Sequence, residues 1–497
     1  MKKIIILFSF TLLVASCKNW LDINTSPNAP SSATLDQIYP SAVTSTVSVF
    51  GGYYALLGGM WSQYFTQNVT SNQYKNIDSY NLIGSDFNTE YTELYAGALN
   101  DFKFVRTQAE QTQNWSYYLM TTAMESYTWQ VLVDLYDNIP FSEANRGAEA
   151  LTGASSDVLS PHYEKGQDIY DSLISRINVA LSKDLHHTEG GVATSADPLY
   201  NDFIFGTNLS LSFDQRMKLW RQFANTLKLK IYLRECYARP TVSQAGIQAM
   251  INDPNFDGFL TVDAAFTQFQ DQASKRNPLY ESNIAQLNTS DNLKASNTLL
   301  TYLDTINDTL RVMHLYSKAG GVYKGLAQGD FANPNISGSS LSGFIESPGD
   351  PVYYFTAAES YFLQAEAVIR GYMTGNDQAL YQSGVLAAFK LWGEDGSNYL
   401  ADHAKPKYLA ASTMEDRLKL IITEKWASMA GLHGLEAFLE QNRTHYPDFL
   451  TYSVQGVTPN GQFPKRLILP ETEKERNKNA PTDNAPVYKK VWWDVKP

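Results

Sequence analysis

Apolar residues recur with helical spacing along most of the chain, in four pairs of neighbouring segments. Within 116–136, Ala123, Tyr127, Val131 and Leu135 repeat every four residues and therefore share one face of a helix. The same spacing predicts helices over 91–111 and 116–136, 161–181 and 218–237, 353–371 and 378–392, and 412–430 and 435–443. The pattern favours four antiparallel helical hairpins.

Local signals mark where several of these helices begin and end. Ser160-Pro161 combines a good N-cap with a proline at the first helical position. The segment Ser412-Thr413-Met414-Glu415 has the pattern of a capping box. Gly431 and Gly434 interrupt the fourth pair and separate its two helices.

The predicted fold class is mainly α, with about four tetratricopeptide-like hairpins that form a solenoid. Such hairpins stack because none of them buries its apolar face alone. Between the second and third pairs lies 238–350, a long loop-rich insert with many Asn, Asp, Gly, Ser and Pro residues. Long insertions on a rigid scaffold commonly carry function. We expect a single domain over 41–497 that includes this insert.

The N-terminus has the pattern of a bacterial lipoprotein signal. Two lysines precede an apolar run over 4–15, and Ala15-Ser16 then precede Cys17. A helix of twelve residues reaches about 18 Å, too short for a hydrocarbon core of about 30 Å. The sequence predicts a signal peptide over 1–16, a lipid on Cys17 and an extended tether over 17–40. The alternative is an ordinary signal peptide in which the cysteine is incidental.

Charge and cysteine content narrow the class of protein. The net charge of −12 and the lack of a basic stripe argue against nucleic acid as a partner. The only cysteine besides Cys17 is Cys236, which lies in a helical segment and is expected to be a small buried side chain. No other apolar run is long enough to span a membrane, so attachment would rest on the lipid.

No motif for catalysis, cofactor binding or metal binding emerges. The chain has no nucleophile elbow, phosphate-binding loop or zinc-protease signature. Residues 253–258 match the start of a calcium loop, but Ala264 occupies the position that requires a bidentate Glu. We therefore interpret this segment as a turn and expect no bound cofactor or metal. Acidic residues are abundant, so a pair of carboxylates for glycoside hydrolysis stays open as an alternative, although no spacing in the sequence brings two of them together.

Two segments rich in aromatic and amide side chains are candidates for ligand binding. Rings beside neutral amides suit a polar, uncharged ligand, because stacking and hydrogen bonding act together without burial of charge. The candidate residues are Trp61, Gln63, Tyr64, Tyr74, Asn76 and Tyr80 in the first segment and Tyr316, Tyr323 and Phe344 in the insert. Trp61 and Phe65 are one helical turn apart, so the alternative that they face the core stays open.

Several blocks of the chain resemble the SusD/RagB family of outer-membrane nutrient-binding lipoproteins. The blocks are LDINTSPNAP at 21–30, VDLYDNIPFSEA at 133–144, WRQFANTLKLKIYLR at 220–234, AAESYFLQAEAVIRG at 357–371, EKWASMAGLHGLEAFLEQNRTHYP at 424–447 and FPKRLILPETEKERN at 463–477. One departure is Asp137, which stands where the family usually has glycine.

The resemblance implies a surface-exposed, lipid-anchored binding protein of the outer membrane. Family members bind an oligosaccharide or peptide and deliver it, as a hinged lid, to a SusC-like TonB-dependent transporter. Two rival functions are a surface glycan hydrolase and a tetratricopeptide scaffold for envelope assembly. Sustained product release by the purified protein would favour the first rival. Co-purification with other proteins, without any ligand-dependent change in stability, would favour the second.

Overall fold

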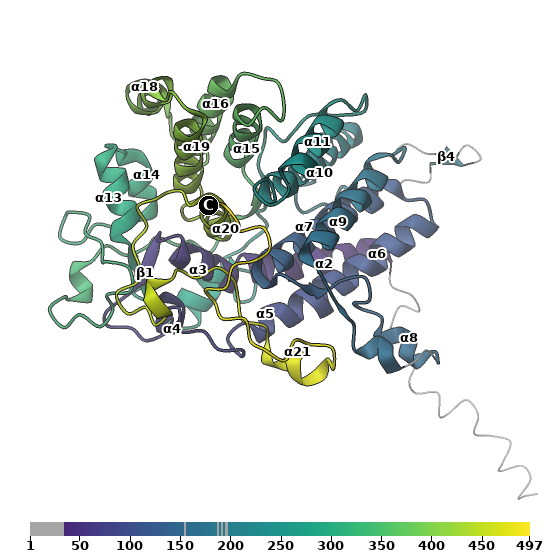
Figure 1. Ribbon diagram of the computed structural model, residues 1–497, viewed down its shortest axis with the longest axis horizontal. Helices are drawn as coiled ribbons and strands as arrows, with labels where there is room; N and C mark the ends of the chain where they lie inside the picture. The colour runs from purple at the N-terminus through teal and green to yellow at the C-terminus, as the bar shows by residue number, and fades with distance from the viewer. Residues whose placement is uncertain (1–33, 154–155, 186–187, 190–191, 194–196) are drawn as a thin grey trace, which may run out of the picture.

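The computed structural model describes residues 34–153, 156–185, 188–189, 192–193 and 197–497. The predicted signal peptide and Cys17 lie outside these residues. The chain is mainly α-helical, and its long helices are arranged as an arc of antiparallel pairs (Figure 1). The predicted fold class is confirmed.

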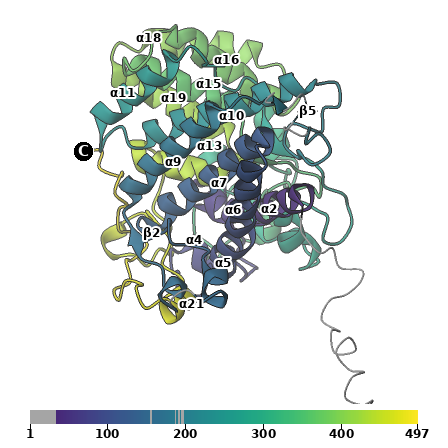
Figure 2. The same cartoon turned by 90° about the vertical axis from the view of Figure 1, so that its right-hand side faces the viewer.

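Four helical hairpins form the arc, as the apolar spacing predicts. Helix α7 packs against α6 on one side and against α9 and α10 on the other, and α15 packs against α10, α16 and α19. Figure 2 shows α6, α7 and α9 in this order. The pairs are α6 (Asn100–Gln111) with α7 (Trp115–Tyr136), α9 (Gly166–Leu181) with α10 (Phe213–Arg234), α15 (Ala357–Ile369) with α16 (Asp377–Lys390), and α19 (Met414–Ser428) with α20 (Gly434–Thr444).

Three of these helices begin later than predicted. Helix α6 begins at Asn100 because the helical stretch before it, Glu93–Leu99, is a π-helix, and in the other two cases a short strand precedes the helix. Helix α9 begins at Gly166 rather than at Ser160-Pro161, since β3 (Tyr163–Glu164) pairs with β2 (Ile139–Pro140). Helix α15 begins at Ala357 rather than Tyr353, because β8 (Val352–Phe355) pairs with β6 (Ala264–Phe266).

The capping box of α19 is formed by the residues next to the predicted ones. Thr413, rather than Ser412, accepts a hydrogen bond from the backbone nitrogen of Asp416 at 3.0 Å. The side chain of Asp416, rather than that of Glu415, reaches back to the N-cap.

The predicted tether is too long at its C-terminal end. Helix α2 (Leu35–Phe50) begins within it and contains Pro40. Thr34 and Gln37 form a capping box, and Tyr39, Ala42 and Val43 are buried. Capping and burial outweigh the one backbone hydrogen bond that a proline removes. Among the described residues, helical structure therefore begins at Leu35, inside the predicted tether.

The insert over 238–350 contains regular structure as well as loops. Besides β6, it holds α11 (Pro240–Ile251), α12 (Pro278–Tyr280), α13 (Asn297–Thr305), α14 (Thr309–Leu315) and β7 (Leu293–Ala295). Strand β7 pairs antiparallel with β1 (Phe65–Gln67), so the insert is joined to the other candidate segment. The remaining elements are α3 (Tyr53–Trp61), α4 (Lys75–Asp78), α5 (Asn88–Thr92), α8 (Gly147–Leu151), α17 (Ser397–Tyr399), α18 (Lys405–Ala410), α21 (Glu471–Arg476), β4 (Thr188–Glu189) and β5 (Val192–Ala193).

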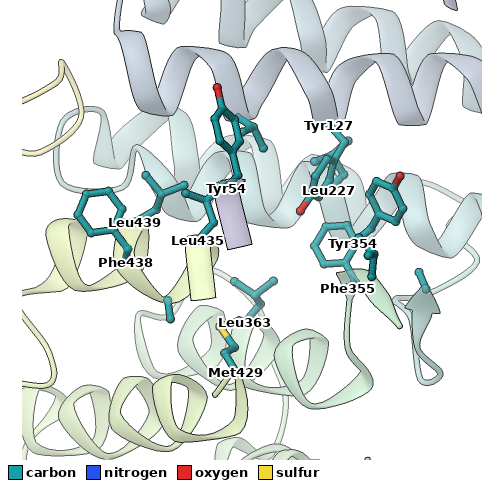
Figure 3. Packing of buried hydrophobic residues seen from close by; sticks show 14 of the residues in the cluster. Tyr54, Tyr127, Leu227, Tyr354, Phe355, Leu363, Met429, Leu435, Phe438 and Leu439 are labelled. Atoms are coloured by element: carbon teal, nitrogen blue, oxygen red, sulfur yellow. The ribbon is translucent and has the colours of Figure 1, made fainter. Parts of the chain in front are cut away.

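A single apolar core joins the hairpins to the N-terminal helices (Figure 3). Tyr54 of α3, Leu227 of α10 and Leu363 of α15 are among its buried members. Helices α3 and α20 cross closely at Gly58 and Gly434, where a Cβ on Gly58 would lie 2.1 Å from the backbone nitrogen of Leu435. Only glycine permits this approach.

A buried cluster of ion pairs connects α10, α15 and α20. Arg443 donates to Glu366 at 2.7 and 2.6 Å and to Glu440 at 2.9 and 2.6 Å. Arg234 of α10 bonds Glu440 and Glu436 of α20 at 2.6 Å each. Burial alone would raise the pKa of Glu440, but Arg443, Lys425 and Arg234 hold that pKa well below its usual value. These carboxylates therefore stay charged in the core.

Two further sequence interpretations are confirmed in the same region. Cys236 is buried, and its Sγ lies 3.5 Å from Nη1 of Arg443. The segment that begins at Asp253 is a turn: the side chain of Asp253 accepts from the backbone nitrogen of Asn255 at 2.8 Å, and Gly258 has a φ of +82°.

Asp137 explains why glycine is usual at its position. It follows α7 with a φ of +72°, in the left-handed region that favours glycine. Its side chain accepts from the backbone nitrogen of Trp492 at 2.9 Å and lies 3.7 Å from Arg466. These contacts offset the unfavourable backbone conformation.

Candidate ligand-binding groove

Most of the aromatic side chains predicted to bind ligand lie in the core. The exposed fraction is 9% for Phe344 and no more than 3% for each of the others in this group, which are Trp61, Tyr64, Tyr74, Tyr80 and Tyr316. In this conformation their faces pack against protein and offer no stacking surface. The alternative that Trp61 faces the core is the one that the structure supports.

The reason is that the two candidate segments pack on each other and on α20. The Trp61 ring lies 4.9 Å from that of Phe438, and its indole nitrogen donates to the carbonyl of Ile77 at 3.0 Å. The hydroxyl of Tyr316 donates to the carbonyl of Tyr64 at 2.5 Å. Satisfied polar tips allow these rings to be buried.

The two candidates with amide side chains, Gln63 and Asn76, take part in contacts within the protein. Gln63 is fully buried; its Nε2 donates to the carbonyl of Thr451 at 2.5 Å, and its Oε1 accepts from the hydroxyl of Thr298 at 2.6 Å. It therefore fixes the start of α13 against the C-terminal segment. Asn76 is half-buried in α4, where its backbone carbonyl accepts from the backbone nitrogen of Asn81 at 2.8 Å.

Phe344 lines a space of about 50 Å³, too small for a ligand. Tyr323 is the aromatic candidate that the structure places at a cavity of ligand size. Its ring is half-buried and lies 5.2 Å from the ammonium of Lys318. The cavity has a volume of about 670 Å³, within the range of small-molecule sites. Leu300, Thr301 and Asp304 of α13 form one wall.

A second cavity of about 540 Å³ lies along the same helix. Its lining includes Thr298, Thr305, Phe449 and Thr451. Asn297 and Thr301 line both cavities, so we treat the two as one feature, the α13 groove.

The sequence of α13 explains why it presents a polar face to this groove. Ser296 caps the helix by accepting from the backbone nitrogen of Thr298 at 3.3 Å. Leu299 and Leu303 are buried, whereas Thr301 and Thr305, one turn apart, are exposed. Burial of the two leucines thus directs a row of hydroxyl groups into the groove.

Phe449 provides an aromatic surface beside these hydroxyls. Its ring is 37% exposed and stacks on Tyr302 of α13, with 5.4 Å between centroids and 17° between planes. Trp426 lies behind it at 5.5 Å, edge to face. One face of the Phe449 ring thus packs against the protein, while part of the side chain is exposed to the cavity.

Phe449 was missed at the sequence level. It follows the block that ends at Pro447 and lies in a polar segment, DFLTYS, without helical spacing. The one feature of the sequence that could indicate Phe449 is an aromatic residue in a loop, and the chain has many such residues. Its contact with Tyr302 joins residues 147 positions apart, which no local pattern reveals.

The charges in the groove suit binding of a neutral ligand. In the larger cavity Lys318 and Lys324 are accompanied by Asp304 and Asp308. Asp308 is not free, because it caps α14 at the nitrogen of Arg311 and bonds the Arg311 guanidinium. No Asp or Glu is among the described residues that line the smaller cavity. A glycosidase would need two carboxylates on either side of the scissile bond.

Comparison with known proteins identifies the class. The SusD-like family described as "starch-binding associating with outer membrane" matches residues 32–470. The chain therefore belongs to this SusD-like family. No curated protein sequence matches this chain.

Solved structures share the fold. A SusD homologue from Bacteroides uniformis aligns with a TM-score of 0.73 and 21% identity over 92% of this chain and 99% of its own. A chitin-binding SusD homologue from Flavobacterium johnsoniae aligns with a TM-score of 0.72 and 20% identity over 92% and 99%. A SusD/RagB family protein from Bacteroides thetaiotaomicron gives 0.72 and 18% over 94% and 100%.

Among the described residues, no helix is both long enough and apolar enough to cross a bilayer.

Proposed function

We propose that this chain binds a neutral oligosaccharide in the α13 groove and delivers it to a TonB-dependent transporter of the SusC type. The observation that carries the proposal is the partly exposed face of Phe449 beside the threonine hydroxyls of α13. A sugar ring has an apolar face and a rim of hydroxyls, which match these two kinds of surface. The family description and the chitin-binding relative support a glycan over a peptide.

Titration of the purified protein tests the glycan part of this proposal. Maltoheptaose, chitohexaose and a peptide mixture should be titrated separately by calorimetry, with chromatography of the sugars afterwards. We expect saturable binding of an oligosaccharide and recovery of intact sugar. Binding of the peptides alone would reassign the ligand, and shortened sugar products would favour a hydrolase.

We further propose that Cys17 carries a lipid that anchors the protein at the outer membrane, exposed on the cell surface. The support is the small-residue pattern before Cys17 in the sequence. Cys17→Ala should yield an unlipidated protein that leaves the membrane fraction when the transporter is absent. Membrane association of this variant without the transporter would contradict a lipid anchor.

We propose that the helical hairpins, rather than the 238–350 insert, make most of the contact with the transporter. A stable partner surface is expected to be large, on the order of 2,000 Å² or more, and to be built on packed elements. The insert instead holds α13, which together with Phe449 and Thr451 of the C-terminal segment lines the groove. Cross-linking in cells should join the barrel mainly to the hairpins, and cross-links confined to 238–350 would refute this placement.

A further inference from the structure

A pocket far from the α13 groove contains a lysine that has no hydrogen-bond or ion-pair partner among the residues that the structure describes. The pocket has a volume of about 250 Å³ and lies between the C-terminal ends of α9 and α11 and the middle of α10. We call it the α9–α11 pocket. Figure 1 shows α10 and α11 on the opposite side of the molecule from α13. Its floor is Lys228 of α10, which is only 6% exposed.

Lys228 differs from every other buried cation among the described residues. Those cations each have a carboxylate within 4.0 Å; they are Arg216, Lys230, Arg234, Lys294, Arg311, Lys425, Arg443 and Arg466. Lys230, two residues along α10, lies 3.5 Å from Glu436. Lys228 forms no hydrogen bond or ion pair with the described residues.

An ammonium in this position is costly unless it acquires a partner. Burial disfavours the charged form and lowers the pKa of Lys228 to about 8, although Asp253 acts in the opposite direction. The group is therefore mostly charged at pH 7. A bound anion would supply the missing partner and would gain from the reduced solvent screening in the pocket.

The other residues that line the pocket indicate which groups a ligand would carry besides its negative charge. Asn178 and Ser182 come from the end of α9, and Asn225 lies one turn before Lys228. Asn225 donates to the carbonyl of Gly258 at 3.0 Å, which leaves its amide oxygen for a ligand. Phe256 and the ring of Tyr232 supply apolar walls. This combination suits a small molecule that carries hydroxyl groups and an apolar face.

The electrostatics limit the ligand to one negative charge. Lys228 provides a single positive charge, and Asp253 is exposed at the rim. The last turns of α9 and α11 also line the pocket, and the C-terminal end of a helix carries negative partial charge. A second negative charge on the ligand would be repelled. The volume corresponds to about eight waters at roughly 30 Å³ each, enough for one sugar-sized molecule.

We propose that the α9–α11 pocket binds a small hydroxylated monocarboxylate, with the carboxylate on Nζ of Lys228. The site is independent of the α13 groove and does not rest on the proposed oligosaccharide function. D-glucuronate is a suitable probe because it combines one carboxylate with several hydroxyls. D-glucose has the hydroxyls but no negative charge. Inorganic phosphate carries more negative charge than D-glucuronate at neutral pH.

Calorimetry of the purified protein with these three probes tests the proposal. We expect saturable binding of D-glucuronate and at least tenfold weaker binding of glucose and phosphate. Lys228→Met should weaken D-glucuronate binding at least tenfold, whereas Lys218→Met, an exposed lysine of the same helix, should leave it unchanged. No binding to the wild type, equal binding of phosphate, or unchanged binding to Lys228→Met would overturn the proposal.

Two further measurements separate binding from folding. Because Lys228 has no hydrogen-bond or ion-pair partner among the described residues, Lys228→Met should unfold at a temperature no lower than the wild type. A marked fall would show that the ammonium is satisfied internally and would count against the site. Asp253→Asn removes the rim charge but also removes a group that raises the pKa of Lys228, so binding is compared at about pH 6, where Lys228 stays charged in both proteins. Under these conditions the variant should bind D-glucuronate about twofold to threefold more tightly. Unchanged or weaker binding to this variant would contradict the proposed electrostatics.

Discussion

Replacing Arg443 with methionine is expected to lower the free energy of unfolding by about 3–5 kcal/mol. Arg443 is fully buried and makes paired hydrogen bonds to Glu366 and Glu440. Methionine fills much of the space but leaves both carboxylates in the core without their main counter-charge. Because a folded domain is stable by only about 5–15 kcal/mol, this change removes a large part of the total.

Urea unfolding followed by circular dichroism measures the effect. Arg146→Met is the matched control, because Arg146 pairs with Glu149 at 2.6 Å but both side chains are well exposed. The control should unfold at the same urea concentration as the wild type. Arg443→Lys should retain the positive charge but cannot form the paired hydrogen bonds of a guanidinium. Its free energy of unfolding should therefore lie between those of the Arg443→Met variant and the wild type. Equal midpoints for Arg443→Met and the wild type would show that the cluster contributes nothing.

Phe449→Ala is expected to weaken oligosaccharide binding by about 2 kcal/mol, roughly 30-fold in Kd. The ring is partly exposed, and its stacking on Tyr302 holds its orientation before any ligand arrives. Pre-organisation of this kind preserves affinity because little side-chain freedom is lost on binding. Tyr323→Ala, at the other cavity, should also weaken binding of sugars long enough to reach both cavities.

Phe104→Ala is the matched control for this prediction. Phe104 is 36% exposed, close to the 37% of Phe449, but lies on α6 outside the groove. Its variant should bind oligosaccharide as the wild type does, and Phe449→Tyr should retain most of the affinity. Loss of binding in Phe104→Ala, or normal binding in both Phe449→Ala and Tyr323→Ala, would exclude the groove. Circular dichroism should confirm that each variant is folded.

The helical hairpins could be predicted from the sequence because their signal is local. Ala123, Tyr127, Val131 and Leu135 are spaced as one face of a helix, and all four are buried in α7. Errors arose where a distant segment decides the local structure. The pairing of β8 with β6 delays the start of α15 until Ala357, and the contacts of α2 override Pro40.

The ligand site could not be predicted in the same way. Polar amides beside aromatic rings suggested exposed binding loops, yet Gln63 is satisfied by Thr451, 388 residues away. Tyr64 and Tyr80 are likewise buried, and their rings contact Trp426 and Tyr452, which are remote in sequence. Conversely, the exposure of Phe449 depends on α13 and Trp426 and is invisible in its own segment. Of the predicted aromatic residues, Tyr323 alone lines one of the two described cavities of the groove.

Amide hydrogen exchange with bound oligosaccharide tests the central claim, that the α13 groove holds the glycan, most directly. Exchange reports the local opening of each segment, and a ligand that contacts a segment slows its opening. The purified protein should be compared with and without a saturating concentration of the oligosaccharide that binds in titration. We predict slower exchange in 297–305 and 449–451 and unchanged exchange in α10 and α11. Protection confined to other segments, with 297–305 and 449–451 unchanged at saturation, would contradict the account.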